Sequence, residues 1–174
     1  MSHQHQSPTR VSGSTLSEPK GVLESLGKDP RLIPQEATNF ESPLALADGL
    51  LTPNERFFIR SNGPVSVDID PESWRLGVTG LVERELALSL ADLKALPHQT
   101  ITAFLECSGN SRNRFPTTPA QVQGTNWGNG AVSNAAWTGV PLATVLEHAG
   151  IRDSAVEVVS QGGDFGGMQR GLPI

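Results

Sequence analysis

The sequence has few of the residues that build crosslinks, metal clusters and membrane spans. It contains one cysteine and no tyrosine among 174 residues. A single cysteine excludes an intrachain disulfide and a cysteine-rich zinc site. No apolar run approaches the roughly twenty residues that a membrane helix needs. We therefore expect no membrane-spanning segment.

Positive charge is also scarce. Lysine and arginine number 13 against 18 aspartates and glutamates, which gives a formal net charge of −5 at pH 7. No long basic run occurs, so the electrostatic pattern of a nucleic-acid-binding protein is absent and we predict no such partner. The N-terminus has neither an apolar signal-peptide core nor a twin-arginine pair. The expected location is therefore cytoplasmic, and a periplasmic one stays open.

Glycine and proline, in contrast, are plentiful. The 18 glycines and 13 prolines favour many turns and a loop-rich α+β fold over a helix bundle. Residues 1–39 are polar and show little periodic pattern, so we predict a disordered or extended N-terminal arm. Residues 40–174 are predicted to form the folded domain.

Alternating apolar residues predict two short strands, over Trp74–Thr79 and Leu86–Leu90. Ser89 lies three residues before Asp92, which is the spacing of an N-cap with an acidic partner. This pair predicts a short helix over residues 91–96 that ends before a proline.

Periodicity is uneven in the second half of the chain. Residues 115–140 lack a clear period, and a stretch of this length is typical of a functional loop. Residues 141–149 predict a helix that Gly150 ends. Residues 155–160 predict a strand, and residues 172–174 the beginning of another.

The single cysteine lies in the most informative stretch. Residues 99–106 are rich in Thr, Ile and Phe and predict a strand that ends directly before Cys107. A lone cysteine is most often a small buried hydrophobic residue. Gly109, Arg112 and Arg114 follow it, however, and neighbouring positive charge favours a reactive thiolate. Composition alone favours the structural interpretation.

Two motifs carry a resemblance to a known family. Leu105-Glu106-Cys107-Ser108-Gly109-Asn110 is similar to the L-E/Q-C-A/S-G-N segment of the sulfite oxidase family. Residues 127–142 resemble that family's W-x-x-G-A-x-x-x-A-x-W-x-G-V-x-L, and V-L-x-x-A-G follows at Val145–Gly150. The motifs keep the family's order over residues 54–174. The resemblance implies an α+β, mixed and loop-rich molybdopterin-binding oxidoreductase fold of the sulfite oxidase type, of which only the N-terminal part is present.

The resemblance also implies a function and a site. It implies oxidation of sulfite to sulfate by oxygen-atom transfer at a molybdenum centre that Cys107 ligates, with an electron-acceptor protein such as a cytochrome as partner. Full-length relatives dimerise. Arg60 alone would be an ordinary surface arginine, but it matches a pocket arginine of the family. The catalytic pocket residues implied are Arg60, Arg112 and Trp127, and the implied contacts of the molybdenum–molybdopterin cofactor are Phe58, Ser61, Asn62, Cys107 and Asp164.

The sequence departs from the family at several points. Ser61 and Asn62 stand where relatives often have Asn-His, and the family's catalytic tyrosine has no counterpart. The region that holds the pterin phosphate in relatives lies beyond Ile174. Two alternatives therefore stay open. One is a related molybdopterin sulfoxide reductase, and the other is a truncated fragment without catalytic activity.

Overall fold

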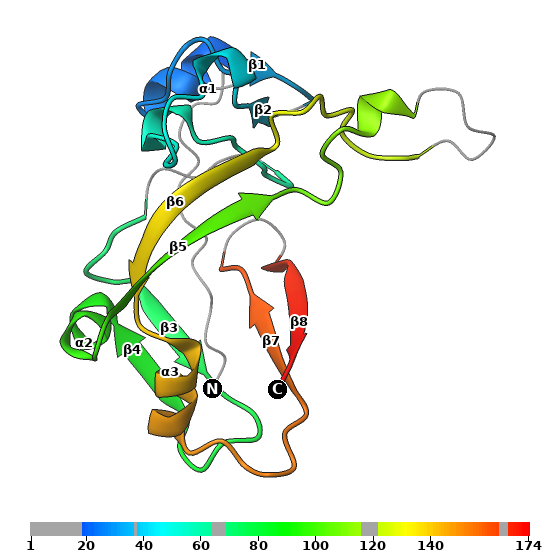
Figure 1. Ribbon diagram of the computed structural model, residues 1–174. Helices are drawn as coiled ribbons and strands as arrows, with labels where there is room; N and C mark the ends of the chain where they lie inside the picture. Colours follow the sequence, from blue (N-terminus) through cyan, green and yellow to red (C-terminus); the bar gives the residue numbers. More distant parts are fainter. Residues whose placement is uncertain (1–18, 37, 64–68, 116–121, 164–166) are drawn as a thin grey trace, which may run out of the picture.

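The computed structural model describes residues 19–36, 38–63, 69–115, 122–163 and 167–174 (Figure 1). Short helices alternate with antiparallel hairpins, and long irregular segments join them. This arrangement confirms the predicted α+β, loop-rich class. The helices and strands run α1 (Pro19–Ser25), β1 (Ile33–Pro34), β2 (Phe40–Glu41), β3 (Arg75–Val78), β4 (Leu86–Ser89), α2 (Leu90–Ala95), β5 (Gln99–Glu106), β6 (Val132–Gly139), α3 (Leu142–Ala149), β7 (Glu157–Gln161) and β8 (Gln169–Pro173).

The hairpin of β5 and β6 is the longest feature of the fold. Its register runs from Gln99 opposite Gly139 to Glu106 opposite Val132. Figure 1 shows it crossing the molecule, with α1, β1 and β2 near one end and α2, α3, β3 and β4 near the other. The Glu106 end carries the cysteine. The hairpin therefore places Cys107 on the side of the N-terminal elements.

Strand β6 corrects one prediction. Residues 115–140 were expected to form a functional loop, but their last third is a regular strand paired along all of β5. The strand is rich in Ser, Asn, Ala and Thr and has no apolar alternation that would reveal it. Its stability comes from the backbone ladder with β5, and the Trp137 Nε1 adds a hydrogen bond to the Ala103 carbonyl at 2.9 Å.

The segment from residue 19 to residue 39 also differs from the expected arm. Helix α1 buries Val22 and Leu23, which pack with Leu32 and Phe40 in a small core. Phe40 pairs with Ile59 in an isolated bridge, which ties this core to the following segment. The apolar residues are too few to raise the average hydropathy of a polar segment, so composition concealed them. Residues 1–18 lie outside the described part.

The strands and the helix predicted near the opposite end are confirmed with small shifts of their bounds. Strands β3 and β4 pair in register from Arg75–Ser89 to Val78–Leu86. Helix α3 ends at Gly150, whose φ of +71° is the left-handed conformation that glycine adopts without strain. The expected strand at the end of the chain is β8, which forms a hairpin with β7.

Helix α2 has the predicted cap. The Ser89 Oγ accepts a hydrogen bond from the Asp92 backbone N–H at 3.1 Å, and the Asp92 carboxylate accepts one from the Ser89 backbone N–H at 2.8 Å. The Ser89 hydroxyl also donates to that carboxylate, and these bonds lower the pKa of Asp92 below its usual 3.8. The stabilisation that depends on the ionised Asp92 carboxylate is therefore fully present above the usual pKa of aspartate. It is lost as the pH falls through the lowered pKa of Asp92.

We expect Ser89→Ala to lower the free energy of unfolding by about 1 kcal/mol, the usual cost of losing an N-cap. The pKa of Asp92 should rise toward its usual value because the hydroxyl's hydrogen bond to the charged carboxylate is lost. Urea unfolding and an NMR titration of the carboxyl measure both effects. Ser154→Ala, at an exposed serine outside any helix, is the control and should change neither.

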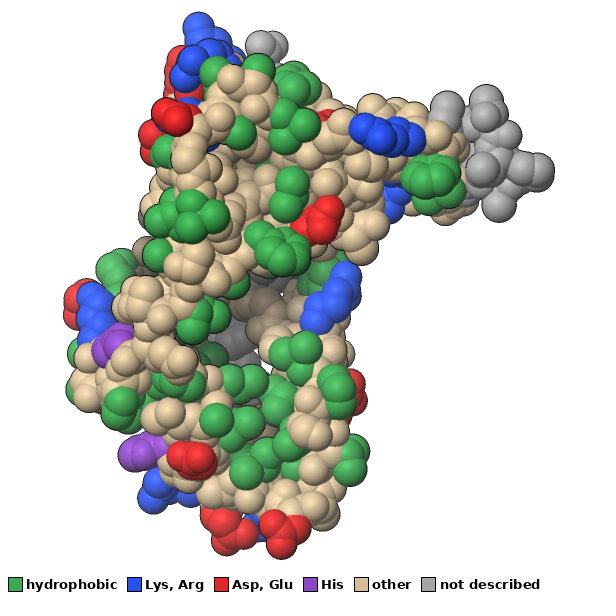
Figure 2. All heavy atoms as spheres, in the orientation of Figure 1, with side chains coloured by type: hydrophobic (Ala, Val, Ile, Leu, Met, Phe, Trp, Pro, Cys, Tyr) green, Lys and Arg blue, Asp and Glu red, His purple; other side chains and the backbone are tan. Residues whose placement is uncertain are grey.

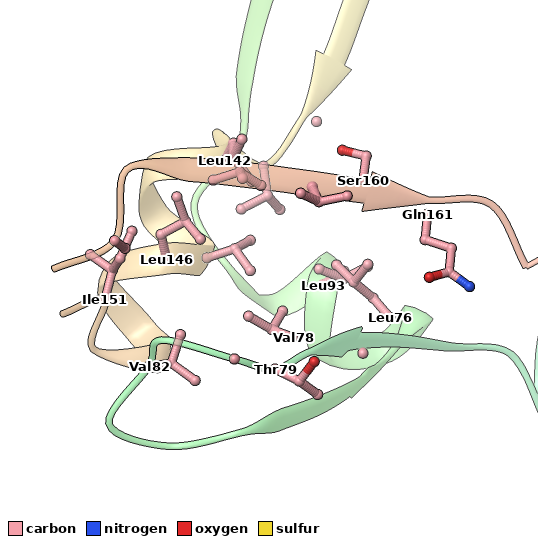
Figure 3. Close-up of a pocket in the computed structure, with 18 of the residues that line it drawn as sticks. Leu76, Val78, Thr79, Val82, Leu93, Leu142, Leu146, Ile151, Ser160 and Gln161 are labelled. Atoms are coloured by element: carbon pink, nitrogen blue, oxygen red, sulfur yellow. The ribbon is translucent and has the colours of Figure 1, made fainter. Parts of the chain in front are cut away.

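A cavity of about 1020 Å³ lies between the β3–β4 hairpin, α2, α3 and β7 (Figure 3). Its wall is largely apolar, and Leu76, Leu93 and Leu146 point into it. It adjoins Gly139, at the end of the hairpin opposite Cys107. The seven steps along β5 from Gln99 to Glu106 separate the two ends by roughly 23 Å. This cavity is therefore separate from the cysteine turn.

Many large apolar side chains are exposed, and Figure 2 shows them on both halves of the face in view. Exposed apolar groups of this extent are typical of surfaces that contact other polypeptide. Examples of exposed apolar side chains on the β5–β6 hairpin are Ile101, Phe104, Leu105 and Trp137.

No helix of the described part is long and apolar enough to cross a membrane.

Candidate functional site

Cys107 lies on a turn directly after β5. Its backbone N–H donates to the Ala131 carbonyl at 2.9 Å, and its carbonyl accepts from the Asn110 N–H at 2.8 Å. The Asn110 side chain in turn accepts from the Ala131 N–H at 3.1 Å. The thiol is half-buried and packs against the small core of Phe58, Trp127 and Ala131. Hydrogen bonds thus hold the turn on both sides of the half-buried cysteine.

The cysteine turn and the tryptophan motif form one structural unit. The Ser111 N–H donates to the Gly128 carbonyl at 2.6 Å, and the Asn113 N–H donates to the Trp127 carbonyl at 3.0 Å. Ser111 has a φ of +65°, the one positive value among the described residues other than glycine. A non-glycine residue in this region is strained, and such strain often occurs at functional sites.

Arg112 follows on this turn with its guanidinium between two glycines. Its Nη1 donates to the Thr125 carbonyl at 2.8 Å. A Cβ atom at Gly109 would lie 2.6 Å from Nη2, and one at Gly124 would lie 2.5 Å from Nη1. The Nε is buried and has no hydrogen-bond partner within the described part of the chain. A buried donor without a partner favours an acceptor that a ligand would supply.

The segment before the first loop packs against the same core. Phe58 is buried, its N–H donates to the Ser133 Oγ at 3.2 Å, and its ring meets that of Trp127 edge-on with centroids 6.3 Å apart. Arg60, two residues on, is exposed. Its guanidinium donates to the Ser61 carbonyl and to the Asn62 Oδ1, both at 2.5 Å.

The structure brings some predicted site residues together and leaves others apart. Phe58, Cys107 and Trp127 share one core, and Arg112 lies on the cysteine turn. In the described ranges, no hydrogen bond joins Arg60 to this turn. Trp127 is fully buried, at 0% exposure, so its ring faces protein on all sides. Asp164 lies outside the described residues, and Asn62 contacts the Met168 sulfur through its Nδ2 at 2.7 Å.

Sequence reasoning missed Glu41, which reaches the tryptophan motif from strand β2. Its carboxylate accepts hydrogen bonds from the Gly128 and Gly130 backbone N–H groups. More than eighty residues separate the partners along the chain. No local pattern in the sequence distinguishes Glu41 from the other acidic residues.

The donor set at the turn limits how a metal could be held. Among the described residues, no group of three or more His, Cys, Asp or Glu side chains could surround a metal ion. Cys107 would supply one thiolate, a soft ligand suited to a redox-active metal. The other ligands must then come from elsewhere, and an organic cofactor that carries its own donor atoms fits this arrangement. The unpaired Arg112 donor fits an anionic ligand beside it.

Comparisons with known proteins identify the family. The family model "Oxidoreductase molybdopterin binding domain" matches residues 62–174. The chain is 43% identical over 122 residues to sulfite oxidase of Gallus gallus, covering 69% of this chain and 26% of the relative. It is 39% identical over 129 residues to mitochondrial sulfite oxidase of Drosophila melanogaster, covering 73% and 22%. The chain thus spans about a quarter of the length of these relatives.

A solved structure has the same fold. The sulfane dehydrogenase SoxCD from Paracoccus pantotrophus superposes with a TM-score of 0.69 at 24% sequence identity. The match covers 97% of this chain and 43% of that one. At this identity the match establishes the architecture, and it includes the N-terminal elements that precede residue 62.

Proposed function

Because the chain belongs to the family of oxidoreductase molybdopterin-binding domains, we propose that it forms the cysteine-bearing part of a molybdenum-dependent enzyme that oxidises sulfite to sulfate. The observation that carries this proposal is the turn after β5, which carries a half-buried cysteine and, five residues on, a buried arginine Nε without a partner in the described part of the chain. Residues 40–174 are the proposed catalytic part, with residues 19–39 packed on it.

Cys107 is the proposed ligand of molybdenum, since ligation favours the thiolate and the turn fixes its backbone at two hydrogen bonds. Bound there, the cofactor would supply two-electron oxygen-atom transfer. Ser61 and Asn62 offer hydrogen-bonding groups for the pterin, and Phe58, in the core that Cys107 packs against, is the third proposed contact of the cofactor. Asp164 is also a proposed contact of the cofactor, and only its position in the sequence supports this.

Arg112 and Arg60 are the proposed binding groups for the sulfite anion. A guanidinium offers five N–H donors in a planar fork, which can hold two oxygens of an oxyanion. Arg112 has a buried Nε that is free to donate, and Arg60 uses only part of its donors on Ser61 and Asn62. Trp127, being fully buried, would act by packing behind the pocket and through its backbone bond to Asn113.

The overall reaction defines the partners. Sulfite gains one oxygen from water and loses two electrons, and the water releases its two protons. The electrons require an acceptor, for which we propose an electron-transfer protein such as a cytochrome. We further propose that the full-length protein dimerises and works in the cytoplasm.

Metal and pterin content after expression with cofactor supply tests the proposal. We expect molybdenum and pterin in equal amounts, and oxidation of sulfite with an artificial electron acceptor. Reduction of methionine sulfoxide without sulfite oxidation would instead support the related sulfoxide reductase. A folded protein without molybdenum would contradict the enzymatic function for this chain.

A further inference from the structure

Glu41 is a buried carboxylate that neutral groups stabilise. Its residue is 4% exposed, and in the described part no lysine or arginine forms an ion pair with it. The Gly128 N–H donates to Oε1 at 2.5 Å and the Gly130 N–H to Oε2 at 2.9 Å. The Gln35 side chain donates to Oε1 as well. Both oxygens are therefore occupied, as a buried carboxylate requires.

The two glycines allow this close approach. A Cβ atom at Gly128 would lie 2.7 Å from the Glu41 Oε2, and one at Gly130 would lie 2.1 Å from the Ser42 carbonyl oxygen. The Ser42 N–H donates to the Gly130 carbonyl at 2.9 Å. Strand β2 and its next residue thus hold Gly130 at both its N–H and its carbonyl.

Hydrogen bonds connect the residues that Glu41 holds to the cysteine turn. Ala131 follows Gly130, and its carbonyl accepts the Cys107 N–H at 2.9 Å. Gly128 has its N–H on Glu41 and its carbonyl on the Ser111 N–H at 2.6 Å. Two of the hydrogen bonds that join the tryptophan motif to the cysteine turn are therefore made by Gly128, which Glu41 holds, or by the residue directly after Gly130.

We propose that Glu41 is a positioning residue that fixes Cys107 through Gly128 and Gly130. The inference deepens the proposed function, because the place of the thiol matters to catalysis only if Cys107 ligates the metal. Glutamate is suited to the task because both of its oxygens accept. A glutamine would turn one oxygen into an NH₂ donor facing a backbone N–H, and one glycine would lose its acceptor.

The reactivity of Cys107 in the chain without cofactor tests this role. Cys107 is the only cysteine, so the rate of modification by a small thiol reagent such as iodoacetamide reports on it alone. We expect Glu41→Gln to raise this rate at least about tenfold, which corresponds to 1.4 kcal/mol of easier loop opening. Glu36→Gln, at an exposed carboxylate on the same segment, is the matched control and should leave the rate unchanged.

Urea unfolding of the same variants separates positioning from general stability. If the substitution releases the turn locally, the rate of Cys107 modification should rise by more than the loss of global stability predicts. That loss is the change in the free energy of unfolding, measured with urea. An unchanged rate, or an increase that global unfolding fully explains, would overturn the proposal. If Glu41→Gln does not fold, Glu41→Asp replaces it, since it keeps both oxygens but is one methylene shorter. An unchanged rate in Glu41→Asp would then overturn the role.

The positioning role of Glu41 and the proposed enzymatic function can fail independently. The molybdenum content of the wild-type chain distinguishes the two failures. A chain that binds no molybdenum but exposes Cys107 in Glu41→Gln retains the positioning role and contradicts the enzyme. A chain that binds molybdenum but shows the same cysteine reactivity in both forms retains the enzyme and contradicts the positioning role.

Discussion

Replacing Cys107 with serine is expected to remove bound molybdenum and to lower sulfite oxidation by more than a hundredfold. Changes to residues that merely orient a ligand cost about 10–100-fold in metal affinity or activity, and this change removes the proposed ligand itself. A hydroxyl is a much harder donor than a thiolate and is not deprotonated as readily. Metal analysis and steady-state assays with sulfite measure the two effects.

The fold should survive this change. Serine is close to cysteine in volume, and the backbone bonds of the turn to Ala131 and Asn110 do not involve the thiol. Ser108→Ala alters the adjacent exposed side chain and is the matched control, expected to keep metal and activity. Full molybdenum content in Cys107→Ser would show that the metal is held without this residue.

Replacing Arg112 with lysine is expected to raise the KM for sulfite about 10–150-fold, the range that 1.5–3 kcal/mol of charged hydrogen bonding corresponds to. Lysine keeps the positive charge but loses the planar fork and the Nε donor. It also loses the guanidinium that fills the space between Gly109 and Gly124. Initial rates over a range of sulfite concentrations measure the change.

Arg114→Lys is the control for this prediction. Residues Arg112–Arg114 form one short turn of 3-10 helix, and Arg114 is its last residue. Arg114 is exposed and makes no side-chain hydrogen bond within the described ranges. Its replacement should leave KM unchanged. Equal effects of the two substitutions would indicate that general positive charge, and not the Arg112 guanidinium held between Gly109 and Gly124, attracts the substrate.

Elements held together by neighbouring residues were predictable from the sequence. The capping box of Ser89 and Asp92 and the Gly150 end of α3 are both confirmed. Each depends on contacts within a few residues, such as a side chain on a nearby N–H or a glycine that relieves a positive φ. Such contacts leave a local pattern that a single sequence displays.

Elements that depend on distant partners were not predictable in this way. Strand β6 has no apolar alternation and is defined by its ladder with β5. The small core around α1 requires Phe40, which lies fifteen residues beyond the end of the helix. A short apolar turn within a polar segment is stable only when such a partner covers it.

The sequence by itself determined that one cysteine follows a strand, that glycines and an arginine surround it, and that the ordered motifs belong to a molybdopterin-binding family. These are properties of residue type and spacing. Only the tertiary structure decided that Trp127 is fully buried, that the Arg112 Nε lacks a partner, and that Glu41 holds the tryptophan motif. The reason is physical. Burial and hydrogen-bond partners arise from segments that meet across the fold, and the identity of a glutamate does not reveal which backbone N–H groups it will accept.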